Sequence, residues 1–329
     1  MTEKIDFSSK EFIAGMIAFS IAFVYVSSSL LLLRFPWILH KRKKHYFKAR
    51  HISHRGGAGE RLENTMPAFE NAINNKTDMI ELDVQLTSDG VVVVSHDSNL
   101  ERKTGVNAYV SDFKFEELPL IKTRLPLDFD RSHITTCSED ATQERTIITL
   151  EEVFEKYPNI PINIDIKTDN DLLIEKVNSL IVSYKRENLT VWGNFGRNVT
   201  NKCYKANPNI GLLFSAPKVA LLTLSFYIGL LPFLPIKESF FEVIMPSILQ
   251  DRFVGYQRVM IKILDCLLLN RYFLRHLQRR GIQIYLWVLN EEEQFEKAFR
   301  LPIDGVMTDF PSKLTSYLVE RKHLLQNQN

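Results

Sequence analysis

The sequence predicts an α/β fold, a (β/α)8 barrel of the TIM type, preceded by an apolar helix. Its 329 residues are 45% hydrophobic and 24% charged, which provides a core for one large domain. After residue 50, strand-like and helix-like segments alternate, as they do in proteins built on a parallel sheet. Nine strand candidates can be counted there, so a barrel of eight strands leaves one short extra strand.

A doubly wound open sheet is the alternative fold for this alternation. Dinucleotide-binding sheets of that class carry a glycine fingerprint directly after their first strand. Gly56, Gly57 and Gly59 follow the first strand candidate here, but they lack the spacing of the fingerprint. The barrel is therefore the better prediction.

Composition limits the functions to be considered. The net charge is only +2, which does not favour nucleic acid as a partner. The three cysteines, Cys137, Cys203 and Cys266, are far apart, so they indicate neither a disulfide framework nor a zinc cluster. Free thiols in a reducing compartment are expected.

The first element is an uncharged segment at residues 12–33, after a short tail at 1–11. Its 22 residues are enough for a helix to cross the core of a bilayer. A signal peptide would have a shorter apolar stretch and a cleavage site of small residues, whereas this segment ends in four leucines and Arg34. We therefore expect a transmembrane anchor.

Residues 34–50 form a basic linker with seven Lys or Arg and no acidic residue. Basic flanks stay on the cytosolic side of membranes, so a single-pass anchor should hold the following domain in the cytosol. The linker would also lie against anionic lipid headgroups.

The domain is expected at residues 51–320, with a short tail at 321–329. Residues 98–146 are polar and lack helical periodicity, so we expect an insertion there. One helix candidate begins after Thr65, and another covers 149–157. The strand candidates are 51–54, 79–86, 91–94, 161–167, 190–195, 210–215, 241–245, 282–290 and 305–309.

Acidic side chains gather on one face of two strand candidates. Because side chains alternate along a strand, Glu81 and Asp83 share a face, and so do Asp165 and Lys167. The apolar faces would pack on helices, and these polar faces would point into the barrel. Buried carboxylates require compensation, which a hard divalent cation provides. Glu81, Asp83 and Asp165 are therefore candidate metal ligands, and an ion-pair network with Arg55 and Lys167 is the alternative.

Two histidines lie where the C-terminal rim of the barrel is expected, which is where barrel active sites are found. His54 ends the first strand candidate, and His96 follows the third. Phosphodiester hydrolysis requires a base and an acid, and histidine can serve as either near neutral pH. Three carboxylates, a divalent ion, Arg55 and Lys167 would together leave one positive charge for a phosphodiester.

These residues resemble, in order and spacing, the glycerophosphodiester phosphodiesterase family over about residues 51–315. The resemblance implies a (β/α) barrel, a divalent metal, Mg²⁺ or Ca²⁺, and a mechanism with two histidines. The matching motifs are His54-Arg55-Gly56, Glu63-Asn64-Thr65, Glu81-Leu82-Asp83-Val84, His96-Asp97, Thr104-Gly105, Asp165-Ile166-Lys167, Trp287-Val288-Leu289-Asn290 and Gly305-Val306-Met307-Thr308-Asp309.

Asp165 departs from the family pattern, which usually has Glu at this position. Because Asp is shorter, the third ligand would sit farther out or act through water. The roles that the resemblance implies are general acid and base for His54 and His96, phosphate contacts for Arg55 and Lys167, and a place beside the metal for Glu63.

A second uncharged segment covers residues 219–235, and three structures compete for it: a spanning helix, a buried helix and a lip that leans on the membrane. A span is disfavoured, because 17 residues are at the short limit and because it would divide the barrel across the bilayer. We expect residues 217–237 to form the lip, with Phe226, Tyr227 and Phe233 along an acyl-chain path. Trp287 would form a wall of the pocket.

The anchor and this segment resemble a membrane-bound subgroup of the family, whose members are lysophospholipase D enzymes of the endoplasmic reticulum or perinuclear membranes. The resemblance implies hydrolysis of lysophosphatidylcholine or N-acyl-lysophosphatidylethanolamine to lysophosphatidic acid and choline or N-acylethanolamine. A lysophospholipid has a free hydroxyl beside the phosphate, which diacyl lipids lack, so little activity on diacyl lipids is expected. Two alternatives stay open: a phosphodiesterase for water-soluble glycerophosphocholine, and an inactive, membrane-tethered binding module. The oligomeric state is not predicted.

Overall fold

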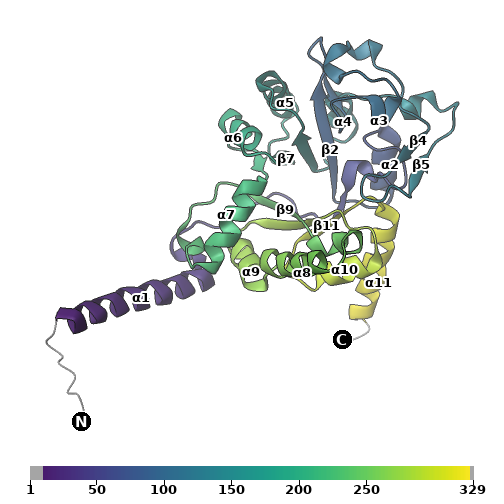
Figure 1. Ribbon diagram of the computed structural model, residues 1–329. Helices are drawn as coiled ribbons and strands as arrows, with labels where there is room; N and C mark the ends of the chain where they lie inside the picture. The colour runs from purple at the N-terminus through teal and green to yellow at the C-terminus, as the bar shows by residue number, and fades with distance from the viewer. Residues whose placement is uncertain (1–9, 327–329) are drawn as a thin grey trace.

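The computed structural model describes residues 10–326, and a nearly closed barrel of parallel strands forms its centre (Figure 1). The strand order is β8-β7-β6-β2-β1-β11-β10-β9, and a parallel bridge between Leu213 and Phe240 brings the two ends of this order together. The predicted barrel is therefore confirmed. Its strands are β1 (His51–Ser53), β2 (Met79–Leu86), β6 (Ile162–Ile166), β7 (Thr190–Gly193), β8 (Gly211–Leu212), β9 (Phe240–Ile244), β10 (Gln283–Trp287) and β11 (Gly305–Thr308).

The ninth strand candidate is the short extra strand. β3 (Val92–Val94) pairs antiparallel with the end of β2 and lies outside the barrel order. Several other candidates are shorter than expected, because their last residues leave the sheet at the rim. Residues 194–195, for example, line a cavity there instead of continuing β7.

Helices surround the strands and bury the apolar strand faces. Ile162, Ile164 and Ile166 of β6 belong to the same core cluster as Leu173 and Val177 of α5. The polar residues of the strands consequently face the inside of the barrel, as the alternation predicts. The covering helices are α2 (Met66–Asn74), α4 (Leu150–Lys156), α5 (Asp171–Ser183), α6 (Arg197–Ala206), α7 (Ala216–Tyr227), α8 (Tyr256–Leu268), α9 (Arg271–Arg279), α10 (Glu292–Phe299) and α11 (Pro311–Gln326).

The segment 98–146 carries its own small elements rather than barrel strands. Its antiparallel pair, β4 and β5, lies apart from the main sheet. The elements are α3 (Glu101–Thr104), η3 (Val110–Asp112), η4 (Phe115–Glu117), β4 (Arg124–Pro126), β5 (Ile134–Thr136) and η5 (Thr142–Arg145).

Helix α1 (Lys10–Arg34) projects from the barrel (Figure 1). Within residues 10–326 it is the one helix that is long and apolar enough to cross a membrane, and most of its side chains are exposed. Its end is held by the barrel. The Tyr25 hydroxyl donates to the carbonyl of Ile228 at 2.5 Å, and the Ser29 hydroxyl donates to that of Gly229 at 2.7 Å.

The second uncharged segment is not one continuous helix. Helix α7 ends at Tyr227, a turn follows, and η6 (Leu231–Phe233) completes the segment. The tails at 1–11 and 321–329 lie partly outside the described residues, and α11 continues past residue 320 to Gln326.

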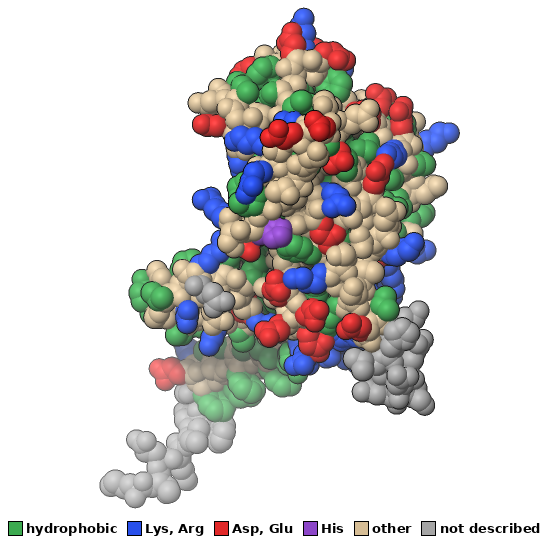
Figure 2. Space-filling model, turned by 90° about the vertical axis from the view of Figure 1, so that its right-hand side faces the viewer, with side chains coloured by type: hydrophobic (Ala, Val, Ile, Leu, Met, Phe, Trp, Pro, Cys, Tyr) green, Lys and Arg blue, Asp and Glu red, His purple; other side chains and the backbone are tan. Residues whose placement is uncertain are grey.

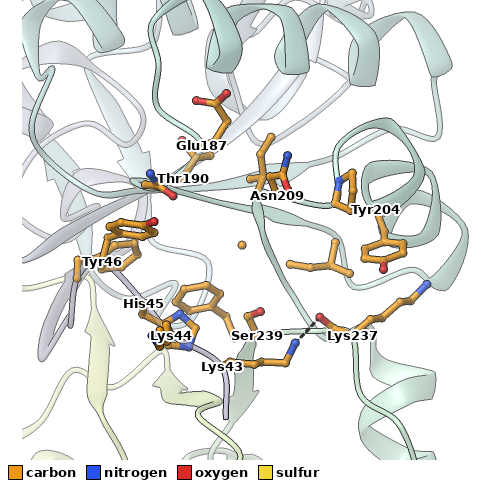
Figure 3. Close-up of a pocket in the computed structure, with 17 residues that line it drawn as sticks. Lys43, Lys44, His45, Tyr46, Glu187, Thr190, Tyr204, Asn209, Lys237 and Ser239 are labelled. Atoms are coloured by element: carbon orange, nitrogen blue, oxygen red, sulfur yellow. Dashed lines mark hydrogen bonds between the residues drawn. The ribbon is translucent and has the colours of Figure 1, made fainter. Parts of the chain in front are cut away.

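After η1 (Pro36–Ile38), the basic linker crosses the amino ends of the strands before entering β1. A side chain at Gly281 would meet the Lys43 carbonyl oxygen at 2.3 Å, so glycine permits this close passage. Figure 3 shows a cavity of about 140 Å³ between the linker and the starts of β7, β8 and β9. The Lys43 ammonium group donates to the carbonyl of Lys237 there, at 2.9 Å. This cavity lies at the opposite end of the strands from the predicted catalytic side chains.

Candidate active site

A cavity of about 430 Å³ opens at the carboxyl ends of the barrel strands. It is lined by seven of the residues predicted from the sequence, and these come from five separate strands or the loops that follow them. The seven residues are His54, Arg55, Glu81, His96, Asp165, Lys167 and Trp287. The position matches the place where barrel enzymes hold their active sites.

His54 is fixed by a carboxylate from the neighbouring strand. It begins a short turn after β1, and its Nδ1 lies 2.7 Å from Asp309 Oδ1. Asn290 holds Asp309 in turn, through an amide N–H that donates to Oδ2 at 2.9 Å. Burial lowers the pKa of His54, but the nearby charges, with Asp309 foremost, outweigh burial and leave that pKa above its usual value.

His96 has the same kind of support on the other side of the cavity. Its Nδ1 lies 2.7 Å from Asp97 Oδ1, and Arg102 Nε donates to the other oxygen of Asp97 at 2.5 Å. The His96 side chain is 28% exposed and that of His54 is 9% exposed. In both imidazoles, Nδ1 therefore lies within hydrogen-bonding distance of a carboxylate, and both rings border the same cavity.

The predicted carboxylates are gathered by strand register, since Asp83 lies opposite Asp165 and Glu81 lies opposite Asn163. Lys167 Nζ lies 2.8 Å from Asp83 Oδ1 and 2.6 Å from Asp165 Oδ2. Glu81 Oε2 accepts the backbone N–H of Arg55 at 2.7 Å. The ion pairs with Lys167 realise part of the alternative network predicted for these side chains.

The pKa values of the two acidic side chains of β2, Glu81 and Asp83, are shifted in opposite directions. Burial and the adjacent Asp83 charge raise the pKa of Glu81 to about 7. Burial would raise the pKa of Asp83 as well, but Lys167 and Arg55 outweigh it and hold that pKa far below its usual value. Asp83 therefore carries the charge of this pair, and Glu81 needs a further cation to ionise fully.

Glu63 does not border the cavity. Its carboxylate accepts N–H groups from Arg55 at 3.1 Å and from Arg102 at 2.5 Å. Arg55 also reaches Asp128 at 2.8 Å, and the pKa of Glu63 is strongly lowered, because the two arginines outweigh the effect of burial. Glu63 is thus placed to orient two arginines rather than to meet an ion in the cavity.

Of the predicted pocket aromatics, only Trp287 lines the cavity, edge-on to Phe129 with ring centroids 6.1 Å apart. Phe226 instead packs on Phe273, at 5.6 Å between centroids. The hydroxyl of Tyr227 donates to the carbonyl of Leu267, and Phe233 stacks on Tyr25 of α1. These three rings, which were expected along an acyl-chain path, do not border this cavity.

Several residues of the site have no assigned role in the sequence analysis. Glu242 lines the cavity from β9, where it accepts both amide hydrogens of Asn163 at 2.8 and 2.9 Å, and burial raises its pKa to about 8. The sequence could have indicated Glu242, because it is an acidic residue within the strand candidate 241–245, as Glu81 and Asp83 are within 79–86. Asp128 and Phe129 come from the aperiodic segment 98–146, where no periodic signal exists.

The donor set suits a hard divalent cation, since carboxylate oxygens are its preferred ligands. Glu81 and Asp165 border the cavity, and Asp83 lies beside them on β2, directly opposite Asp165. In residues 10–326, however, no three His, Cys, Asp or Glu side chains already stand in the arrangement of a metal cluster. The residues thus fit such an ion by chemistry.

Known proteins are similar to this chain in sequence. The sequence profile of the glycerophosphoryl diester phosphodiesterase family matches residues 54–313. The rat and human proteins named lysophospholipase D GDPD1 are 50% identical to the chain over 299 residues, 89% of this chain and 94% of theirs. The mouse protein named lysophospholipase D GDPD3 is 40% identical over 307 residues, 92% of each chain.

Solved structures confirm the fold. The glycerophosphoryl diester phosphodiesterase domain of a Mycobacterium tuberculosis protein superposes with a TM-score of 0.63 at 16% identity, over 82% of this chain and 99% of that one. A glycerophosphodiester phosphodiesterase from Agrobacterium tumefaciens gives 0.59 at 18% identity, over 81% and 99%. The chain thus belongs to the glycerophosphoryl diester phosphodiesterase family and is a phosphodiester hydrolase.

Proposed function

We propose that the chain is a membrane-anchored lysophospholipase D, which splits lysophospholipids into lysophosphatidic acid and the headgroup alcohol. The observation that carries this proposal is the pair of carboxylate-supported imidazoles, His54 and His96, on one cavity with buried acidic and basic groups. The relatives at 50% and 40% identity bear the name lysophospholipase D, which supports the same substrate class.

The two histidines act as general acid and base in this proposal. One takes the proton of the attacking hydroxyl, and the other protonates the leaving oxygen. Arg55 and Lys167 bind the phosphate oxygens and stabilise the charge that grows on them. Glu81, Asp83 and Asp165 hold Mg²⁺ or Ca²⁺, which supplies further positive charge to the phosphate when bound.

The nucleophile is the free glycerol hydroxyl of the lysolipid. It lies on the carbon chain beside the phosphate, so its attack is intramolecular and favoured by proximity. A cyclic phosphate forms and is then opened by water at the same two histidines. Diacyl lipids lack this hydroxyl and should react far more slowly.

Helix α1 anchors the enzyme as a single span, with the barrel in the cytosol at endoplasmic reticulum or perinuclear membranes. Support comes from the contacts of Tyr25 and Ser29 with residues 228–229. Tyr25 and Ser29 lie about 8 to 14 Å along α1 from its end at Arg34, given a rise of about 1.5 Å per residue. The 217–237 segment therefore reaches along the side of the span and forms the membrane-contacting lip.

The test is a substrate panel for the full-length protein in detergent and in vesicles. We expect turnover of lysophosphatidylcholine and N-acyl-lysophosphatidylethanolamine, loss of turnover with EDTA, and recovery with Mg²⁺ or Ca²⁺. Faster turnover of glycerophosphocholine than of any lysolipid would favour a water-soluble substrate instead. Activity on no substrate of the panel would favour an inactive binding module.

A further inference from the structure

Helix α8 has its apolar side facing outward. Ile261, Asp265 and Leu268 mark the side turned toward the protein, since they are the less exposed positions and share one face at about 100° per residue. The opposite side is apolar, although an outward face on a soluble protein is normally polar. It consists of Val259 (56% exposed), Met260 (51%), Ile263 (45%), Leu264 (51%) and Leu267 (37%), with exposed Cys266 among them.

This face continues toward the membrane anchor. Tyr227 at the end of α7 donates its hydroxyl to the carbonyl of Leu267 at the end of α8. On α7 itself Leu221 and Leu224 are more than half exposed. The turn that follows α7 contacts Tyr25 of α1, and Figure 1 shows α1 leaving the barrel beside α7 and α9.

The charges around this apolar surface are strongly basic. From Arg252 to Arg279 the chain has six Lys or Arg, all exposed or partly exposed, and one acid, Asp265. That acid is neutralised within the protein, because Asp265 Oδ2 pairs with Lys297 at 2.9 Å and its Oδ1 accepts the backbone N–H of Ser247 at 3.0 Å. The face turned away from α1 differs: Figure 2 shows acidic and basic side chains interspersed there.

We propose that the outward face of α8, together with the exposed part of α7, lies in the interface of an anionic membrane. Apolar residues would enter the boundary between headgroups and acyl chains, and the basic residues would meet the anionic headgroups. The bilayer is the occupant because the surface is continuous with α1. The inference rests on the proposed membrane anchor and adds a second contact to it.

This contact would set the position of the active site. The segment between β9 and α8 touches the cavity wall, since the Arg252 guanidinium donates to the carbonyl of Phe129. Phe195, at the rim of the same cavity, is 71% exposed. A barrel lying on its α7–α8 side brings this mouth to the membrane level, where a lysolipid can enter without leaving the bilayer entirely.

Cys266 provides a native probe of the contact, because it lies seven residues after Val259 on the same side of α8. Cys137 and Cys203 are replaced by Ser, and the full-length protein is labelled at Cys266 with a polarity-sensitive fluorophore. The matched control carries Cys266→Ser and a label at Glu175→Cys, an exposed position on α5. Both proteins are reconstituted in vesicles of phosphatidylcholine and phosphatidylserine.

We expect lipids brominated in their acyl chains to quench the label at Cys266 at least about threefold more than the label at Glu175→Cys. Equal quenching at the two sites would overturn the proposal. So would a label at Cys266 that is shielded from aqueous iodide yet not quenched by brominated lipid, because a protein and not the bilayer would then cover α8.

A second measurement links the surface to turnover. Ile263→Gln with Leu267→Gln should lower kcat/KM for lysophosphatidylcholine in vesicles about tenfold and leave turnover of the same lipid in detergent unchanged. The control is Leu172→Gln with Val182→Gln on α5, whose side chains are similarly exposed. Equal vesicle activity of both variants contradicts the inference, whereas wild-type inactivity on lysolipids contradicts the proposed function and leaves the quenching result standing.

Discussion

His54 Nδ1 and Asp309 Oδ1 lie 2.7 Å apart, although 255 residues separate them in the chain. The contact follows from strand pairing, because β1 and β11 are neighbours and both residues directly follow their strands. A carboxylate in this position fixes the orientation of the imidazole and stabilises its protonated form.

Replacing Asp309 by Asn should lower the pKa of His54, since the carboxylate is the main group that raises it against burial. The limb of the pH–rate profile that reports His54 should therefore move to lower pH. If the acidic limb moves, His54 is the base; if the basic limb moves, it is the acid. Profiles of kcat/KM for Asp309→Asn and for the exposed control Glu291→Gln measure this, and an unchanged profile for both would contradict it.

Glu63→Gln should destabilise the fold by about 3 to 5 kcal/mol, because it leaves the buried Arg55 guanidinium with one partner fewer. The control is Glu70→Gln, which breaks a surface pair with Lys156 and should cost less than about 1 kcal/mol. Denaturant unfolding in detergent gives both values. Equal costs for the two substitutions would show that Glu63 is not the structural support inferred from its contacts.

Glu81→Gln should weaken binding of the divalent ion, because it removes a candidate ligand and keeps an oxygen that can accept the Arg55 N–H. Wild type should gain thermal stability when Mg²⁺ or Ca²⁺ is added, and Glu81→Gln should gain much less at the same concentration. Glu238→Gln, a buried position outside the cavity, is the control. An undiminished gain in Tm for Glu81→Gln would exclude Glu81 as a ligand.

Strand periodicity made much of the site predictable. Because alternate side chains share a face, Glu81, Asp83 and Asp165 could be grouped before any contact was known, and strand ends placed His54 and His96. Asp128 and Phe129 could not be predicted as site residues, because the segment 98–146 lacks the periodicity from which the direction of a side chain can be inferred.

Helix orientation was harder to predict than strand orientation. An apolar stripe on a helix is expected to face the core, and the sequence alone does not show which side of α8 meets the protein. Phe226, Tyr227 and Phe233 were misplaced for a related reason. The turn after Tyr227 directs the end of this segment toward α1, which uncharged residues alone do not reveal.

Buried His51 should make stability depend on pH between about 4 and 6.5. Burial lowers its pKa to about 4, so in that window the unfolded chain binds a proton that the folded chain does not. Its contribution to stability is therefore lost as the pH falls, by up to about 3 kcal/mol. Glu81 and Glu242, whose pKa values are raised, act in the opposite direction.

The comparison with His51→Gln isolates this effect, because the two carboxylates titrate alike in both proteins. The difference in unfolding free energy between wild type and His51→Gln should change by up to about 3 kcal/mol from pH 7 to pH 4, to the disadvantage of wild type. A difference that stays constant over this range would refute the assignment.

The most direct test of the site is the rate at which wild type, His54→Ala and His96→Ala release choline from lysophosphatidylcholine at saturating metal. Wild type should form choline and lysophosphatidic acid in equal amounts, and each variant should be slower by about 10²- to 10⁴-fold. Retention of the wild-type rate by either variant would contradict the assignment of this cavity as the catalytic centre.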